Sequence, residues 1–562
     1  MSVAPAELSL RPPEQVMRLS RMGVFHQCRL SFMRQLTRRM QAEAWRFTRP
    51  VFEVDARGVG HAVYCAHTPH RTYSLIAFAH DLPADQRSDR VIAEAWDSTF
   101  TLFDGVPDAA DIARLAENVP LQEAGRITET ELSLSRANRS VRLWDHVVSA
   151  LAEGHQPDGD QIDATGYLMR TTAVYGSGKF GAVDREQIAD RPEFMAPFQV
   201  EMLSVYLTRT YVRDLVQHMA DQKGDARAAT LDPALARRLG IGNSTGLGMA
   251  PFLLNHPALL HNWMAARETA LARVRAVPRA TPQDQALFGD LLARSVRSAA
   301  LWRSEHPVQV EKLAVLRADL DRLTEHVAAF DLGRAHPWDH LYRWADTALG
   351  EDAQECLASL MLEPYGALVD DLAPSMSAEV TDSFCVDGRM DVATLRAGIE
   401  ARYGWALAVD WTVPERCARA WYVSAEKLEP RLGERHSEPI EDYEQPLAPG
   451  RDIAALHTDL AQAPEVEPVA AFLLRHPHHR YAVRRVQITR DAPYAEIRDN
   501  TIDAALLPID MLRCKLSFFG ATHFDPRSDR WVRICLYRDA PYPEDLAQAD
   551  ADFWPYPPLH AA

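Results

Sequence analysis

The spacing of apolar residues changes twice along this chain, and these changes constrain the fold more than any other feature of the sequence. Between residues 51 and 135 the pattern is typical of short antiparallel strands, which we expect at Val51–Asp55, His61–Ala66, Thr72–Ala79, Thr99–Phe103 and Glu131–Ser135. From residue 139 to about 425 apolar residues recur every three or four positions, as they do in amphipathic helices. Strand-like patterns return at Tyr481–Thr489, Arg513–Phe519 and Trp531–Tyr537. The sequence therefore predicts an α+β fold with antiparallel sheet regions near both ends and a large helical middle.

The same patterns divide the chain into four predicted parts. We expect helices at Arg139–Leu151, Phe198–Ala220, Leu259–Val277, Gln285–Ala299 and Val308–Phe330. The proline-rich, charged stretch Glu429–Gly450 indicates a linker or long surface loop. The predicted parts are a basic N-terminal helical arm over 1–50, an α+β domain with glycine-rich loops over 51–277, a helical domain over 283–428, and a C-terminal α+β region over 451–562.

Charge and composition exclude several classes of protein. The formal net charge of -17 argues against nucleic-acid binding by the whole surface. The seven cysteines are scattered without a C-x-x-C pair, which disfavours a disulfide framework. No apolar stretch approaches the roughly 18 residues of a membrane span, and Met1–Leu10 lacks the pattern of a secretory signal. We therefore expect a cytoplasmic protein that binds neither membrane nor nucleic acid.

The first fifty residues reverse the overall charge. Nine arginines lie between Arg11 and Pro50, against only Glu14 and Glu43. We expect these arginines to pair with the acidic body of the protein or with a second copy of the chain, which would make it a homo-oligomer.

Lysine is scarce, and one lysine lies among glycines. Only five of the 61 basic residues are lysine, a bias typical of GC-rich bacterial genomes. Lys179 follows Gly176, Ser177 and Gly178. Glycine lets backbone N–H groups approach a ligand closely, and a lysine can lose its proton when desolvated. We predict that this loop binds carboxylate or phosphate oxygens and that Lys179 acts as a general base or stabilises charge. A phosphate-binding P-loop is not expected, since Ala173 and Phe180 occupy two of its fixed positions.

A second glycine cluster runs from Gly240 to Gly248 and contains Asn243, Ser244, Thr245 and Gly246. Glycines mixed with small polar residues before an apolar run predict a helix N-terminus that binds an anion. The cluster resembles the Ser-Gly-Asn-Thr-Gly loop of fold-type-II pyridoxal-phosphate enzymes, although the order of its polar residues differs. That resemblance implies a Schiff-base role for Lys179, which lies upstream as it does in that family.

A third group of candidates lies on the expected helix Arg139–Leu151. Arg139, Arg142 and His146 would share one helix face, where two arginines could hold an anion and the histidine could relay a proton. No metal site is predicted, because His476, His478 and His479 are flanked by arginines and have no carboxylate at ligand spacing. No G-x-S-x-G motif is present.

Together these groups predict an enzyme that acts on a small carboxylate or phosphate. Lys179 and His146 would be catalytic, with proton abstraction leading to elimination or isomerisation, as in a lyase or isomerase. Two alternatives remain open: an enzyme dependent on pyridoxal phosphate or another cofactor, and a non-catalytic assembly or regulatory protein that docks through its basic N-terminal helix. The sequence does not specify the cofactor.

Overall fold

The computed structural model describes most of the chain: residues 10–83, 96–121, 128–139, 141–171, 188, 190–196, 198–245, 254, 257–377, 386–417, 420–422, 430–432, 448–501, 514, 517–521, 523–526, 532–548 and 554–556. Its contacts define two compact units, each made of three separate segments. Unit 1 combines Met1–Phe25, Gly246–Pro282 and Asp331–Cys514, and unit 2 combines His26–Thr245, Gln283–Phe330 and Lys515–Ala562. The units thus interleave along the chain, whereas the sequence predicts four consecutive parts.

Unit 2 is built on one nine-stranded sheet, so the two predicted sheet regions join. The strand order is β1 (Arg46–Val54), β2 (Gly60–His67), β3 (Thr72–Ala79), β4 (Ser98–Asp104), β5 (Glu131–Asn138), β6 (Tyr167–Thr171), β7 (Gly240–Thr245), β11 (Val532–Leu536) and β10 (His523–Pro526). Neighbouring strands are antiparallel except β6 and β7, which are parallel. The predicted α+β class is confirmed.

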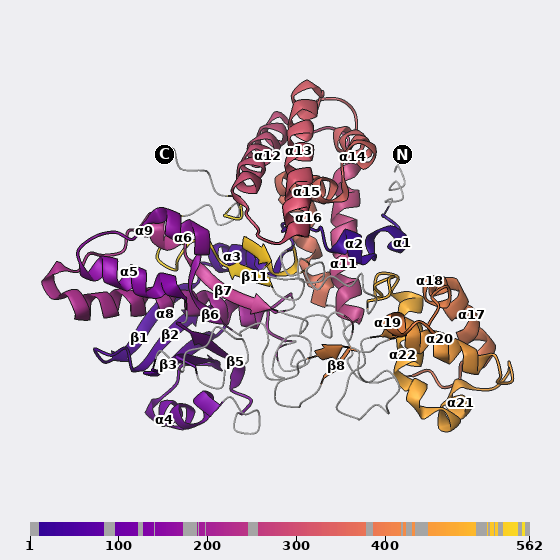
Figure 1. The fold of residues 1–562 in the computed structure, drawn as a ribbon, viewed down its shortest axis with the longest axis horizontal. Coiled ribbons are helices and arrows are strands. Elements are labelled where there is room, and N and C mark those ends of the chain that lie inside the picture. Colours follow the sequence, from indigo (N-terminus) through magenta and orange to yellow (C-terminus); the bar gives the residue numbers. More distant parts are fainter. Residues whose placement is uncertain are drawn as a thin grey trace. The chain divides into compact units, whose positions relative to one another are not determined.

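Helices cover both faces of the strands β1–β5 (Figure 1). The long helix α8 (Gln199–Gly224) packs on one face, where the ring of Tyr211 lies 6.2 Å from that of Tyr64. Side chains of a strand alternate between faces, and Val63 instead packs with Leu115 of α4 (Ala109–Asn118) on the other face. The remaining longer helices of unit 2 are α3 (Phe32–Ala42), α5 (Arg142–Ala152), α6 (Gly159–Thr165), α12 (Pro282–Leu301) and α13 (Pro307–Ala329).

Unit 1 is mainly helical. One group comprises α1 (Pro13–Val16), α2 (Leu19–Met22), α11 (Pro257–Arg275), α14 (Pro337–Ala348), α15 (Glu351–Met361) and α16 (Gly366–Val369). A second group comprises α17 (Val392–Arg402), α18 (Gly404–Leu407), α19 (Pro414–Cys417), α20 (Pro449–Leu460), α21 (Val469–Arg475), the short 3-10 helix η6 (Pro477–His479) and α22 (Arg480–Asp491) (Figure 1). Leu395, Leu456, Phe472 and Val483 share a fully enclosed apolar core in this second group, which fixes its helices against one another.

Four of the nine arginines of the N-terminal segment, Arg11, Arg21, Arg29 and Arg34, are buried. Arg11 and Arg21 belong to unit 1, where both contact Glu355, and Arg34 of α3 in unit 2 has no exposed surface. These three side chains are therefore not available to a docking partner.

Two predicted strands of the C-terminal region are wrong. Tyr481–Thr489 forms most of helix α22, whose buried residues Ala482, Val483, Val486 and Thr489 follow helical spacing. In Arg513–Phe519, the described residues Cys514 and Ser517–Phe519 are helical. The third predicted strand, Trp531–Tyr537, is confirmed as β11. Among the helices that the structure describes, none is both long and apolar enough to cross a membrane.

Candidate functional site

The glycine-rich loop predicted around Lys179 lies outside the described residues. This applies to Gly176, Ser177, Gly178 and Lys179, and also to Gly246 of the second cluster. The roles predicted for these residues, including a Schiff base at Lys179, remain predictions.

The described part of the second cluster is a strand and not a helix N-terminus. Residues Gly240–Thr245 form β7, whose backbone pairs with β6 and β11, so these peptide groups do not form a free anion cradle. A side chain at Gly242 would place its Cβ 2.4 Å from the ring of Tyr167, so this glycine serves the close approach of two strands. Asn243 is buried and donates a hydrogen bond from Nδ2 to the carbonyl oxygen of Thr171 at 2.9 Å. Ser244 and Thr245 continue the strand, paired with Arg533 and Val532.

The predicted face of Arg139, Arg142 and His146 does not form. The strand β5 extends to Asn138, which pairs with β6, and helix α5 begins only at Arg142. Arg139 therefore lies between the strand and the helix. Its backbone N–H and its guanidinium both bind the buried carboxylate of Asp97, at 2.6 and 3.2 Å. Arg142 is exposed at the start of α5, and His146 is half-buried on that helix. Arg139 therefore belongs to a buried ion pair with Asp97, and of the three predicted residues only Arg142 and His146 lie on α5.

A groove in unit 2 offers a different set of polar side chains. It has a volume of about 730 Å³ and lies between strands β1 and β2 and helix α8, next to Pro543 and Glu544. Residues of β1 supply one side, those of α8 the other, and three aromatic residues, Trp45, Phe47 and Tyr64, contribute apolar surface. The volume is within the range of small-molecule sites.

Positive charge in this groove comes from three arginines, Arg46, Arg49 and Arg213, against the carboxylates of Asp214 and Glu544. Asp214 is the common partner: it accepts from Arg49 at 2.7 Å, from Arg213 at 3.1 Å and from the hydroxyl of Tyr64 at 2.9 Å. Burial and the Asp214 carboxylate raise the pKa of Tyr64, which keeps its hydroxyl protonated and donating. The lining thus carries an excess of one positive charge in a protein whose net charge is -17.

Two further groove residues differ in how strongly they are held. His67 is half-buried, with Nε2 2.9 Å from the hydroxyl of Thr48 and Nδ1 3.0 Å from that of Thr72. Arg46 is exposed, and within the described part of the chain its guanidinium forms no hydrogen bond or ion pair. Arg46 is therefore a cation of the groove lining without a partner in the described part of the chain, and it lies on the same sheet face as its cross-strand neighbour His67.

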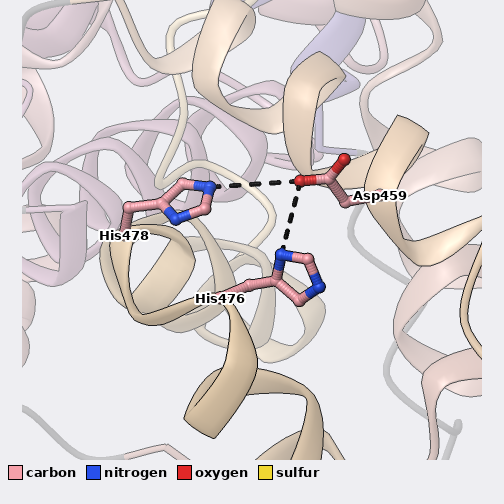
Figure 2. Close-up of side chains that lie close together, drawn as sticks. All are labelled: Asp459, His476 and His478. Carbon is pink, nitrogen blue, oxygen red and sulfur yellow. Dashed lines mark ion pairs between the residues drawn. The ribbon is translucent and has the colours of Figure 1, made fainter.

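A second group of polar side chains lies in unit 1, and Figure 2 shows three of its members. Asp459 of α20 faces His476 and His478, with its Oδ2 3.8 Å from Nδ1 of His476 and 3.9 Å from Nε2 of His478. His479 is buried and lies 2.8 Å from the same oxygen through its Nε2. Burial lowers the pKa of His479, and the nearby Asp459 carboxylate opposes that effect. Among the described residues this is the one cluster with the spacing of a metal site.

Comparison with known proteins adds no further assignment: no protein-family model, no curated protein and no solved structure matches the chain. Both sites therefore stand on their own geometry. The sequence contained part of the signal for the groove, since Arg46 and Arg49 belong to the basic first fifty residues. Helix α8 lies far along the sequence from Arg46 and Arg49, and Asp459 is separated in sequence from His476 and His478. Sequence spacing alone therefore does not indicate either site.

Proposed function

We propose that this protein binds a small anionic molecule, a carboxylate or phosphate, in the groove between β1 and α8. The observation that carries this proposal is that Arg46, Arg49 and Arg213 all line one groove. Guanidinium groups match the geometry of carboxylates and phosphates and can bind both oxygens at once. The class of ligand is the one expected from the sequence, but the residues that would bind it are different.

The contacts of Asp214 prepare the groove for an anion. Asp214 holds Arg49 through a single nitrogen, Nη1, among the described residues, so other N–H groups of that guanidinium remain free to donate. Arg213 is held more fully, by Asp214 and by an ion pair with Glu544. Arg213 would therefore supply fixed positive charge, while Arg46 and Arg49 would supply most of the direct hydrogen bonds.

The aromatic residues indicate the rest of the ligand. Trp45, Phe47 and Tyr64 line the same groove, and since Trp45 and Tyr64 are buried, an apolar part attached to the anionic group would contact mainly the half-buried ring of Phe47. A small metabolite with one or two acidic groups suits such a lining better than a free inorganic ion.

Catalysis in this groove would need a group that exchanges protons, and His67 is the histidine of its lining, with a side chain that leaves β2 on the face opposite to that of Tyr64. Both of its ring nitrogens face hydroxyl groups, which can either donate or accept a hydrogen bond. We propose His67 in place of His146 as the proton carrier if the protein performs the elimination or isomerisation expected from the sequence.

The binding proposal is tested by measuring the thermal midpoint of untagged full-length protein with phosphate, pyrophosphate, citrate and a set of aromatic carboxylates. We expect at least one anion to raise the midpoint, and the R46Q/R49Q double variant to lose that response. Arg57 provides the matched control, since it is an exposed arginine of the β1–β2 turn outside the groove. The proposal fails if no anion stabilises the protein, or if R57Q reduces the response as much as the double variant does.

A further inference from the structure

The cluster of histidines in unit 1 has the composition of a transition-metal site. Imidazole nitrogens and a carboxylate oxygen are ligands that Zn²⁺, Ni²⁺ and Cu²⁺ accept. Asp459, His476 and His478 each present one such atom, and all three atoms lie within 4.8 Å of one another. We propose that Asp459, His476 and His478 bind a divalent transition metal, with Zn²⁺ as the reference ion. This proposal is independent of the groove in unit 2.

Local structure brings these residues together. Asp459 lies in the last turn of α20, His476 directly follows the end of α21, and His478 belongs to the single 3-10 turn η6. Both imidazoles face Asp459 (Figure 2). The sequence contains the histidines as neighbours, but only the packing of α20 beside the α21–η6 turn supplies the carboxylate.

The cluster is supported by the core beneath it. Phe472 of α21 is fully buried, and its ring stacks on His476 with a centroid distance of 4.7 Å and on His479 at 6.0 Å. His479 also contacts the Asp459 carboxylate at 2.8 Å. Such a contact from a residue behind the ligands orients a carboxylate, as is usual around protein metal ions.

The distances require only a small adjustment to bind an ion. Ligand atoms about 2.0–2.1 Å from a tetrahedral Zn²⁺ lie roughly 3.3 Å apart. Asp459 Oδ2 is 3.8 Å from His476 Nδ1 and 3.9 Å from His478 Nε2, so each of these two pairs would close by about 0.5 Å on binding. The two imidazole nitrogens lie within 4.8 Å of each other and would close by at most about 1.5 Å. His478 is the most exposed member, with 63% of its side chain accessible, and can make this adjustment by rotating.

The flanking arginines do not oppose a cation as the sequence suggests. Arg475 forms an ion pair with Glu467, and the guanidinium of Arg480 lies 4.9 Å over the ring of Tyr481. Both positive groups therefore have partners other than the cluster. Three protein ligands on an exposed surface leave a coordination position for water or a further ligand.

The test is a calorimetric titration of Zn²⁺ into untagged full-length protein after chelator treatment, for wild type and for H478A and D459N. We expect one strong site in the wild type and at least about 100-fold weaker binding in both variants, since loss of even an outer partner costs 10–100-fold. The matched control is H457A, because His457 lies on the same helix and pairs with Glu400 outside the cluster.

Substitution of Co²⁺ supplies a second readout that does not depend on affinity. Tetrahedral nitrogen–oxygen coordination should produce a visible absorption band that is absent in H478A and retained in H457A. The proposal is overturned if wild type has no Zn²⁺ site of stoichiometry one, or if H478A binds Zn²⁺ as tightly as wild type. The second result would place the ion at other histidines or at cysteines.

Discussion

Replacing Glu355 of helix α15 by glutamine tests whether the buried charges of unit 1 are held as one network. The Glu355 side chain has no exposed surface and accepts from Arg11 at 2.5 Å, from Arg21 at 3.2 Å and from Arg267. Glu268 is the second carboxylate, 2.7 Å from Arg11 and 2.9 Å from Arg267. E355Q keeps the shape of the side chain but leaves Arg11 and Arg267 against the single carboxylate of Glu268, while Arg21 keeps only a 3.5 Å contact with the partly exposed Glu351.

The expected cost follows from the burial of these charges. Breaking a buried ion pair by removing one partner typically costs about 3–5 kcal/mol, because the remaining charge stays desolvated. In contrast, an exposed pair contributes about 0–1 kcal/mol. Arg273 and Asp371 form such an exposed pair in the same unit, at 2.7 Å, so D371N is the matched control.

Hydrogen exchange of the amides in α11 and α15 measures this cost within unit 1. A loss of 3–5 kcal/mol corresponds to exchange that is faster by about 100- to 4,000-fold, since 1.4 kcal/mol is a factor of ten. We expect E355Q to reach this range and D371N to remain within about fivefold of wild type. If E355Q changes exchange no more than D371N does, the network contributes nothing measurable and the reasoning is refuted.

E355Q should also change how the stability of the protein depends on pH in the acid range. The buried carboxylate is desolvated, which would raise its pKa, but Arg11 and Arg267 outweigh this and hold the pKa of Glu355 well below its usual value. Its contribution to stability is therefore complete above its unfolded pKa, about 4.3, and is lost as the pH falls toward the lower folded pKa. Below pH 4.3, wild type should lose stability more steeply than E355Q.

Two further predictions concern unit 2. G242A should lower the free energy of unfolding by about 1–3 kcal/mol, because the added Cβ would overlap the buried ring of Tyr167. G289A should instead raise the free energy of unfolding by up to about 1 kcal/mol, since nothing lies within 4 Å of that helical position. Urea unfolding measures both changes, and equal effects of the two variants would contradict the role of Tyr167 packing. Burial lowers the pKa of His80, although the Asp97 carboxylate opposes this shift. The contribution of His80 to stability is therefore complete above its unfolded pKa of about 6.5, and it decreases as the pH falls below that value. The thermal midpoint of H80Q should accordingly drop less than that of wild type between pH 7 and pH 5, and an identical drop would show that His80 does not contribute.

Local sequence patterns predicted most of the secondary structure, because many elements bury one face with a regular period. The predicted strand Thr72–Ala79 coincides with β3, and the predicted helix Val308–Phe330 nearly coincides with α13. The error at Tyr481–Thr489 arose because VRRVQI alternates partly like a strand, while burial follows the helical set of α22. The joining of N-terminal and C-terminal strands in one sheet depends on pairing between β7 and β11, which no local pattern encodes.

The candidate sites were harder to predict, because each combines distant segments. Arg139 looked like a ligand-binding cation on a helix, but its backbone and side chain are both held by Asp97, which directly precedes β4. The glycines at Gly240 and Gly242 looked like an anion-binding loop, but they permit close strand packing. Likewise, the groove and the histidine cluster depend on Asp214 and Asp459, two ordinary helical aspartates whose roles appear only when the helices are packed.

A crystal structure of the full-length protein, grown with the anion that stabilises it most, would show directly where that anion binds. The proposed function predicts density for that anion in the groove between β1 and α8, with its acidic group within hydrogen-bond distance of Arg46 and Arg49. Density for the anion elsewhere on the protein, with the groove containing only water, would contradict the proposed function.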